Sequence, residues 1–277
     1  MSAEEYFRSI GINSFQPGFY DEPAFVAKEA ETPRILELYA EYVLEQRYSK
    51  KYLRHARHVI THTCEFLYGR LAKDGRKGAC CDLSLTLNRM LDRLGIWNYL
   101  VKGCLSIYFN AASNRNSVHF ALVSDQKHRT APAPHAWVVA PPFYVVDVTV
   151  KHQVYPNHEE RFLPEFILED TVRQVETSVS DWFEAPVLAA LKAFYGRSMT
   201  MMDARHFAGE QALTNSERFG AYEVKTQHAC LKYIAVGICA CAKPLDEIKS
   251  LCLSGDFPSA LYPQLVGYLA QARAASP

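Results

Sequence analysis

The stretch GRKGACCDLSLTLNRMLDRLG, residues 75–95, joins a glycine-rich turn to a strongly amphipathic helical pattern. Its apolar residues recur mainly at steps of three and four, the spacing that gives a helix one apolar face. Gly95 follows the last of them, where a glycine commonly ends a helix. Cys80 shares the apolar stripe with Leu83, whereas Cys81 is rotated about 100° away from it. The sequence therefore predicts a helix whose first turn carries two thiols in different surroundings.

The position of Cys80 favours chemistry at its sulfur. A thiol in the first turn of a helix lies near unpaired backbone N–H groups and the positive end of the helix dipole, which both favour thiolate. Arg76 and Lys77 stand just upstream and add positive charge. We expect a lowered pKa at Cys80 if the thiol stays partly exposed, and free N–H groups that can bind an oxyanion. Cys80 is therefore predicted to be a nucleophile.

A base and an acid for this thiol are found further along the chain. After Gly95 the apolar period changes to two, which predicts strands over 97–109, 117–125, 135–139 and 143–150. A thiolate nucleophile needs a general base, and the base needs an orienting partner. If residues 140–142 form a turn, His135 lies directly opposite Asp147, with Cβ atoms ~5 Å apart. A shift of one residue would put the two side chains on opposite faces.

Two other groupings of polar residues remain as alternatives. His119 followed by Asp125 is a rival base and acid pair in a neighbouring strand. His55, His58 and His62 share one face of a helical pattern and could be interpreted as a metal site. That set lacks a carboxylate or thiol to complete it, so a partly exposed helix face is the better explanation, and we predict no metal.

Four short motifs follow one another along the chain: Gly78-Ala79-Cys80-Cys81-Asp82, Leu94-Gly95-Ile96, His135-Ala136-Trp137 and Asp147-Val148-Thr149. In this order they resemble the transglutaminase-like superfamily of cysteine enzymes. Its members typically show a Gly-x-Cys-x-Asp start, a Leu-Gly-Ile helix end, a His-Ala-Trp strand and an Asp-Pro-Thr strand. The resemblance covers about residues 50–150.

The resemblance implies an α+β fold, a papain-like core in which a helix with an N-terminal cysteine packs on an antiparallel sheet. It also implies a Cys80, His135 and Asp147 triad, with Cys81 at a variable position. Such a triad performs acyl transfer through a thioester and requires no metal or organic cofactor. Backbone amides near Cys80, helped by Cys81, Trp97 or Trp137, are candidates for binding the oxyanion or the substrate. Tyr68 and Asn98 are further candidates.

Hydrolysis of a peptide or other amide is the function that we expect, with a peptide or protein substrate as the partner. Transamidation, cross-linking or deamidation of proteins is an alternative, because only the second nucleophile differs. A catalytically inactive binding module of the same fold is another. Cys81 adds one more hypothesis, in which its thiol traps an oxidised Cys80 reversibly.

The composition of this chain of 277 residues limits its expected binding partners and cellular location. Thirty Lys and Arg balance thirty Asp and Glu, so no net charge draws it to nucleic acid or an anionic membrane. The acidic N-terminus lacks the pattern of a signal peptide, and eight cysteines then indicate reduced thiols in the cytoplasm. The apolar run 233–242 is too short to cross a bilayer and is predicted to be a buried helix.

The expected organisation has three parts. Residues 1–50 form a helical extension, residues 51–160 the transglutaminase-like core, and residues 161–277 a mostly helical region. Four helices are predicted from Asp181 onward, in the stretches WFEAPVLAALKAFYG, QHACLKYIAVGICA, DEIKSLCL and ALYPQLVGYLAQARA. The sequence does not predict the oligomeric state.

Overall fold

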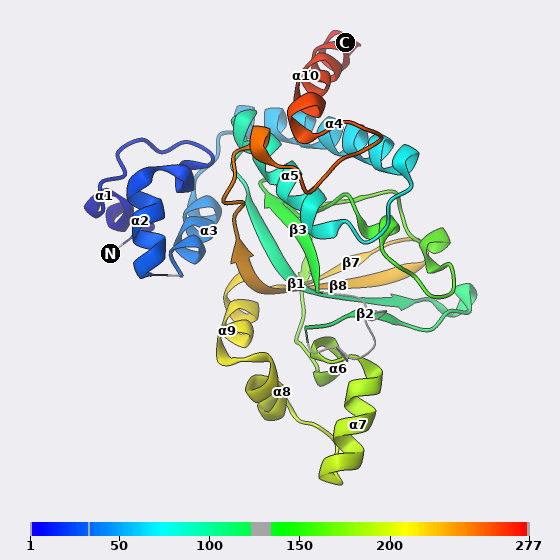
Figure 1. Ribbon diagram of the computed structural model, residues 1–277. Coiled ribbons are helices and arrows are strands. Elements are labelled where there is room, and N and C mark those ends of the chain that lie inside the picture. Colours follow the sequence, from blue (N-terminus) through cyan, green and yellow to red (C-terminus); the bar gives the residue numbers. More distant parts are fainter. Residues whose placement is uncertain (1, 33, 123–133, 276–277) are drawn as a thin grey trace.

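The computed structural model describes residues 2–32, 34–122 and 134–275. One antiparallel sheet forms its centre, and helices pack around it (Figure 1). The strands of the described residues are β1 (Tyr99–Phe109), β2 (Val118–Phe120), β3 (His135–Ala140), β4 (Phe143–Asp147), β5 (Ile167–Glu169), β6 (Arg173–Gln174), β7 (Ala221–Lys225) and β8 (Ala229–Cys239). They are ordered β5-β4-β3-β1-β8-β7-β6, and β2 pairs with β1. The expected α+β class is therefore confirmed.

The helices of the described residues occupy three regions around the sheet. They are α1 (Ala3–Ser9), α2 (Pro23–Glu31), α3 (Ile35–Glu45), α4 (Lys50–Asp74), α5 (Cys80–Arg93), α6 (Val179–Trp182), α7 (Ala185–Tyr195), α8 (Met201–Ala208), α9 (Glu210–Phe219) and α10 (Pro258–Ala275). Short 3₁₀ turns lie at Phe19–Asp21, Ala111–Ser113, Val150–His152, Glu159–Phe162 and Leu245–Glu247. None of these helices is long and apolar enough to span a bilayer.

Alternate residues of the central strands point into different parts of the core. Val101 of β1 joins a cluster with helices α1 and α3, whereas its neighbour Leu100 joins one with α4, α5 and α10. A third cluster joins Cys104 of β1 and Ile234 of β8 to α6, α8 and α9. The three helical groups surround the sheet in Figure 1. Because β1 is buried on both sides, it fixes the helices that flank it relative to one another.

The helix predicted from residues 75–95 is present as α5. Its buried side chains include Leu83, Leu87 and Leu91, the apolar stripe of the sequence pattern. Gly95 follows the C-cap with a φ of 74°, a left-handed conformation that glycine adopts without strain. The helical pattern that carries His55, His58 and His62 is likewise confirmed, as part of α4.

The helix predicted over residues 233–242 is wrong. Most of this run lies in β8, which pairs with both β1 and β7. Tyr233 and Ile234 point into different buried clusters, so both faces of the strand must be apolar. The sequence of a strand that is buried on both faces is a continuous apolar run. Such a run lacks the alternation of apolar and polar residues that would distinguish the strand from a buried helix.

The C-terminal part of the chain differs from the expectation in other ways too. Residues 161–277 supply β5 to β8 to the sheet, so this region is not mostly a helical addition to the core. The stretch DEIKSLCL contains only a short 3₁₀ turn, Leu245–Glu247. Helices α8 and α9 were not predicted. The helices α7 and α10 are confirmed.

Candidate active site

The two thiols lie where α5 meets the start of β3. Helix α5 begins at Cys80, and the Ser84 hydroxyl donates a hydrogen bond of 3.0 Å to the Ala136 carbonyl oxygen of β3. Gly78, with a φ of 70°, donates its N–H to the His152 carbonyl oxygen at 2.8 Å, which fixes the turn before the helix. Cys80 is only 6% exposed, whereas Cys81 is exposed.

The predicted base and acid are in direct contact. His135 Nε2 lies 2.7 Å from Asp147 Oδ2, and both side chains are fully buried. Thr149 donates its backbone N–H and its hydroxyl to Asp147 Oδ1 at 2.8 and 2.9 Å. The Tyr233 hydroxyl donates to Oδ2 at 2.9 Å. This carboxylate is thus held by four hydrogen bonds from three residues, His135, Thr149 and Tyr233.

These contacts favour the ionised form of Asp147. Burial alone would raise the pKa of Asp147, but the charge and hydrogen bond of His135 and the two bonds from Thr149 together lower it. An ionised carboxylate can only accept hydrogen bonds, so His135 Nε2 carries the proton. The other ring nitrogen of His135 is Nδ1. This Nδ1 is buried and has no hydrogen-bond partner among the described residues.

The strand register that brings His135 to Asp147 differs from the predicted one. Val138 pairs with Val146, and a shift in register separates this pair from the pairing of Ala140 with Phe143. His135 is therefore not directly opposite Asp147, as predicted, but lies diagonally across from it. Because the total displacement is two residues, both side chains stay on one face. Diagonal neighbours remain within reach of each other.

The thiols of Cys80 and Cys81 are hydrogen-bonded to each other. The pKa of Cys81 is lowered to about 6, first because Cys80 donates this hydrogen bond, and further through electrostatic interactions with His135 and Lys102. Burial and Asp82 act in the opposite direction. The negative charge of the pair therefore rests on Cys81, the thiol that water can solvate.

Cys80 does not have the lowered pKa that we expected from its position. Its hydrogen bond to Cys81, its burial and the charge of Asp147 raise its pKa, and only the Ala136 N–H acts in the opposite direction. The cations upstream are engaged elsewhere. Arg76 donates to the Cys252 carbonyl oxygen at 2.7 Å, and Lys77 lies 3.5 Å from Glu160.

Electrostatic interactions and one backbone hydrogen bond connect the thiol pair with the strand of the imidazole and with the carboxylate. The Ala136 N–H that bonds to Cys80 belongs to the residue after His135, and Asp147 acts on Cys80 electrostatically. His135 acts in the same way on Cys81. The candidate site thus combines an ionisable thiol pair with a buried imidazole that interacts with it electrostatically, and Nδ1 of that imidazole makes no hydrogen bond to either thiol.

Trp97 does not belong to this site, contrary to our expectation. Its ring packs against Phe19 and Tyr42, with centroid distances of 6.2 and 5.5 Å. Its backbone N–H donates to the Tyr52 hydroxyl at 2.8 Å. Trp97 is therefore part of the aromatic cluster that attaches the N-terminal helices to the sheet.

Trp137 does lie beside the candidate base. Its ring is stacked on His135, with centroids 6.3 Å apart and an angle of 21° between the planes. It also packs edge-on against Tyr233 at 5.2 Å. Trp137 is only 2% exposed, so it supports the imidazole by packing. The hydroxyl of Tyr233 was missed by sequence reasoning because its strand was interpreted as a helix.

The other candidates have partners of their own. Tyr68 packs against His152 and Phe166, and Asn98 donates to Asp92 and Ile96. His119 contacts the hydroxyls of Ser106 and Ser117, each at 3.0 Å, and Asp125 lies outside the described residues. In the described part of the chain, no group of three or more His, Cys, Asp or Glu side chains could hold a metal.

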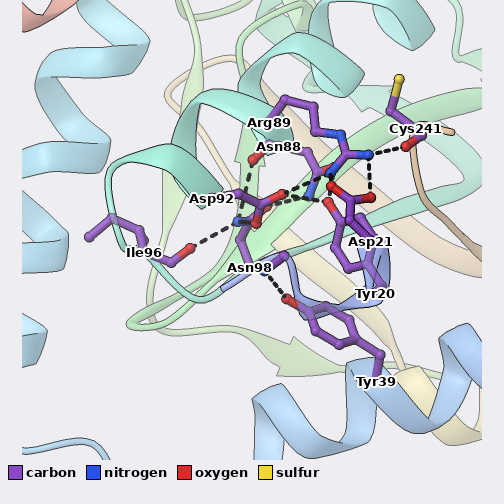
Figure 2. Close-up of polar contacts among 10 residues, drawn as sticks. Tyr20, Asp21, Tyr39, Asn88, Arg89, Asp92, Ile96, Asn98 and Cys241 are labelled. Atoms are coloured by element: carbon purple, nitrogen blue, oxygen red, sulfur yellow. Dashed lines mark hydrogen bonds and ion pairs between the residues drawn. The ribbon is translucent and has the colours of Figure 1, made fainter. Parts of the chain in front are cut away.

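A buried polar network anchors the far end of α5 (Figure 2). Arg89, whose side chain is 4% exposed, pairs with Asp21 through two bonds of 2.6 and 2.7 Å. The Tyr20 hydroxyl donates to Asp92 at 2.5 Å, and Asn98 donates to the same carboxyl at 2.9 Å. These bonds connect the segment after α1 with α5 and β1. They hold in place the helix that presents the two thiols.

Burial has a strong effect on one member of this network. It raises the pKa of Asp92 to about 7, against the hydrogen bond from Tyr20 and the charge of Arg89, which lower it. The network therefore gains or loses a proton near neutral pH. This ionisation lies outside the candidate active site, because Asp92 is at the opposite end of α5 from Cys80.

Comparisons with known proteins add no relative to this description. No family model matches the chain, and neither a search of curated proteins nor one of solved structures finds a significant match. The function is therefore inferred from the site itself.

Proposed function

We propose that this protein is a cysteine-dependent acyl-transfer enzyme of the transglutaminase-like superfamily, with a papain-like core, that hydrolyses a peptide or other amide bond. One observation carries the proposal. The His135–Asp147 pair is fully buried with Nε2 bonded to the carboxylate, which leaves Nδ1 without a hydrogen-bond partner in the described part of the chain, and the same two residues interact electrostatically with the thiols of Cys81 and Cys80. A nucleophile, a base and an orienting acid are the three groups that such a reaction needs.

The reaction begins with the proton shared by the two thiols. One proton leaves the pair for His135 Nδ1, and the remaining proton lies in the hydrogen bond between the sulfurs. When that proton moves to Cys81, Cys80 becomes the thiolate. Its sulfur attacks the carbonyl carbon of the substrate, and backbone N–H groups at the start of α5 stabilise the resulting oxyanion.

The intermediate then collapses. His135 gives its proton to the leaving amine, the C–N bond breaks, and the acyl group stays on Cys80 as a thioester. A water molecule gives a proton to His135 and attacks the thioester, the C–S bond breaks, and a carboxylic acid is released. The proton on His135 then returns to the sulfurs, which restores the thiol pair. Asp147 keeps the imidazole oriented and stabilises its charged form in both steps. No metal or organic cofactor takes part in these steps.

Water is favoured as the second nucleophile because one member of the thiol pair, Cys81, is exposed to solvent. Exclusion of water would be needed for an amine to compete with it efficiently. A primary amine in the same role would make the protein a transamidase or cross-linking enzyme. An inactive triad would leave a binding module of the same fold.

One experiment separates these outcomes. The protein is incubated with a complex peptide mixture in heavy-oxygen water that also contains a fluorescent primary amine, and the products are read by mass spectrometry. Hydrolysis incorporates heavy oxygen into new carboxyl groups, whereas transamidation attaches the amine. We expect hydrolysis in the wild type and in Cys252→Ala, and its loss in Cys80→Ala and Asp147→Asn. Absence of both products in the wild type would refute the proposal.

A further inference from the structure

The pairing of one exposed thiol with one buried thiol is more than the acyl-transfer reaction requires. Cys81 is exposed, Cys80 is 6% exposed, and their sulfurs are hydrogen-bonded to each other. Oxidants in solution therefore meet the thiol of Cys81 more readily than that of Cys80. A hydrogen-bonded partner is also already in place to react with any oxidised form of Cys81.

The surroundings of Cys81 make it the reactive member of the pair toward oxidants. Thiolates react with peroxides, and susceptibility follows thiolate character and exposure. Lys102 of β1 and His135 of β3 stabilise the negative charge of Cys81, and Asp82 is the acidic group that opposes them. With its pKa near 6, Cys81 is mostly thiolate at neutral pH.

We propose that Cys81 is a peroxide-sensitive modification site and that Cys80 converts its oxidised form into a disulfide between the two adjacent residues. In the first step, the Cys81 thiolate attacks one oxygen of hydrogen peroxide. The O–O bond breaks, the sulfur is oxidised to sulfenic acid, and hydroxide leaves. In the second step, the Cys80 sulfur attacks the Cys81 sulfur, the S–O bond breaks, and the oxygen leaves as water with the proton of Cys80. Two thiols and one peroxide thus give one disulfide and water.

This disulfide is suited to reversible oxidation. The Cα atoms of adjacent residues lie ~3.8 Å apart across a trans peptide, below the ~4.4–6.8 Å typical of disulfides. The strained bond is easily reduced by other thiols. Cys239, at the end of β8, is the other thiol that interacts electrostatically with Cys81, and it is the competing partner for the oxidised sulfur. The existing hydrogen bond favours Cys80.

The effect on activity rests on the proposed function, whereas the oxidation chemistry does not. With both sulfurs in one bond, no thiolate remains to attack a substrate. The oxidised protein is then inactive until a reductant restores the pair. Oxidation of the pair would occur in the same way in a protein that lacks acyl-transfer activity.

The test uses hydrogen peroxide on the full-length protein, with dimedone present to capture sulfenic acid and peptide mass spectrometry as the readout. In the wild type and in Cys239→Ser, we expect the Cys80–Cys81 peptide to lose two hydrogen atoms and to regain them with dithiothreitol. In Cys80→Ser, dimedone should accumulate on Cys81. In Cys81→Ser, oxidation of Cys80 should slow on the order of tenfold, because Cys80 is buried and its pKa is raised.

Three results would overturn the proposal: a disulfide between Cys81 and Cys239, faster oxidation of Cys80 than of Cys81, or direct progress of Cys81 to sulfinic acid without a disulfide. The same samples are assayed for peptide hydrolysis. A disulfide that forms in a protein without hydrolytic activity would refute the proposed function and support the modification site. Full activity of the quantitatively oxidised protein would refute the inactivation by oxidation.

Discussion

Replacing Cys80 with alanine removes the hydrogen bond that contributes most to the low pKa of Cys81. We predict that the pKa of Cys81 in Cys80→Ala rises from about 6 toward the ordinary thiol value of ~8.5. It should stop short of that value, because Lys102 and His135 still stabilise the thiolate. The variant thus separates the contribution of the neighbouring thiol from that of the cations.

The size of the effect on reactivity depends strongly on pH. At pH 7, a thiol of pKa 6 is about 90% thiolate and one of pKa 8.5 is about 3%, a roughly 30-fold difference. Nucleophilicity falls with pKa at a slope of ~0.4–0.5, which offsets about 13-fold of that gain. The wild-type thiol is therefore only about twofold faster at pH 7. At pH 6 the same calculation gives about tenfold.

The assay is a pH–rate profile of iodoacetamide labelling at Cys81, read by peptide mass spectrometry with a limiting amount of reagent. The wild-type profile should have its midpoint near pH 6, and that of Cys80→Ala should be displaced to higher pH. Cys252→Ala serves as the control and should leave the midpoint in place. A wild-type midpoint near 8.5, or the same midpoint in both proteins, would refute the proposed role of the hydrogen bond.

Two further predictions concern stability. Because the folded-state pKa of Asp92 is raised to about 7 from 3.8, its stabilising contribution is complete below about pH 4 and is lost as the pH rises through 7. Asp92→Asn should remove the part of this loss that falls between pH 5 and pH 8, about 2.6 kcal/mol in urea unfolding, and equal pH slopes in the two proteins would contradict the assignment. In Gly103→Ala, the new Cβ would lie 2.1 Å from the Ile234 carbonyl oxygen and 2.4 Å from Trp137, so we expect a loss of about 3 kcal/mol. Gly237→Ala, with no atom within 4 Å of its Cβ, should unfold within about 0.5 kcal/mol of the wild type; similar losses in both would contradict the packing.

The helix with the two cysteines was predictable because several local signals agree there. The apolar spacing, the preceding turn and Gly95 each specify α5 without reference to the rest of the chain. The pKa values of its thiols were not predictable in the same way. They depend on contacts of Cys80 and Cys81 with residues of β1, β3 and β4, which are distant in sequence.

The contact between His135 and Asp147 shows what patterning predicts about a hairpin and what it does not. Alternation predicted that the two side chains share a face, which holds because a displacement of two residues preserves the face. The displacement itself arises from a two-residue turn at Pro141 and Pro142 and a shift in register after Val138. Neither the short turn nor the shift in register changes the alternation of apolar residues, so the sequence pattern does not reveal them.

Strand β8 could not be recognised from the sequence for a different reason. Its two faces pack against different helices, so the alternation that normally reveals a strand is absent. The consequence extends to the site, because Tyr233 of β8 donates to Asp147. A residue that orients the candidate acid was therefore hidden within a segment that was predicted to be a helix.

The most direct test of the triad is to trap the acyl group on a specific sulfur. The protein is mixed with p-nitrophenyl acetate, quenched in acid within the first turnover, and digested for peptide mass spectrometry. His135→Ala and Cys81→Ala are treated in the same way. The Cys80, His135 and Asp147 assignment predicts one acetyl group on Cys80 in the wild type and in Cys81→Ala, and its loss in His135→Ala. No acetyl group on Cys80 in the wild type, or acetylation of Cys80 that does not depend on His135, would contradict it.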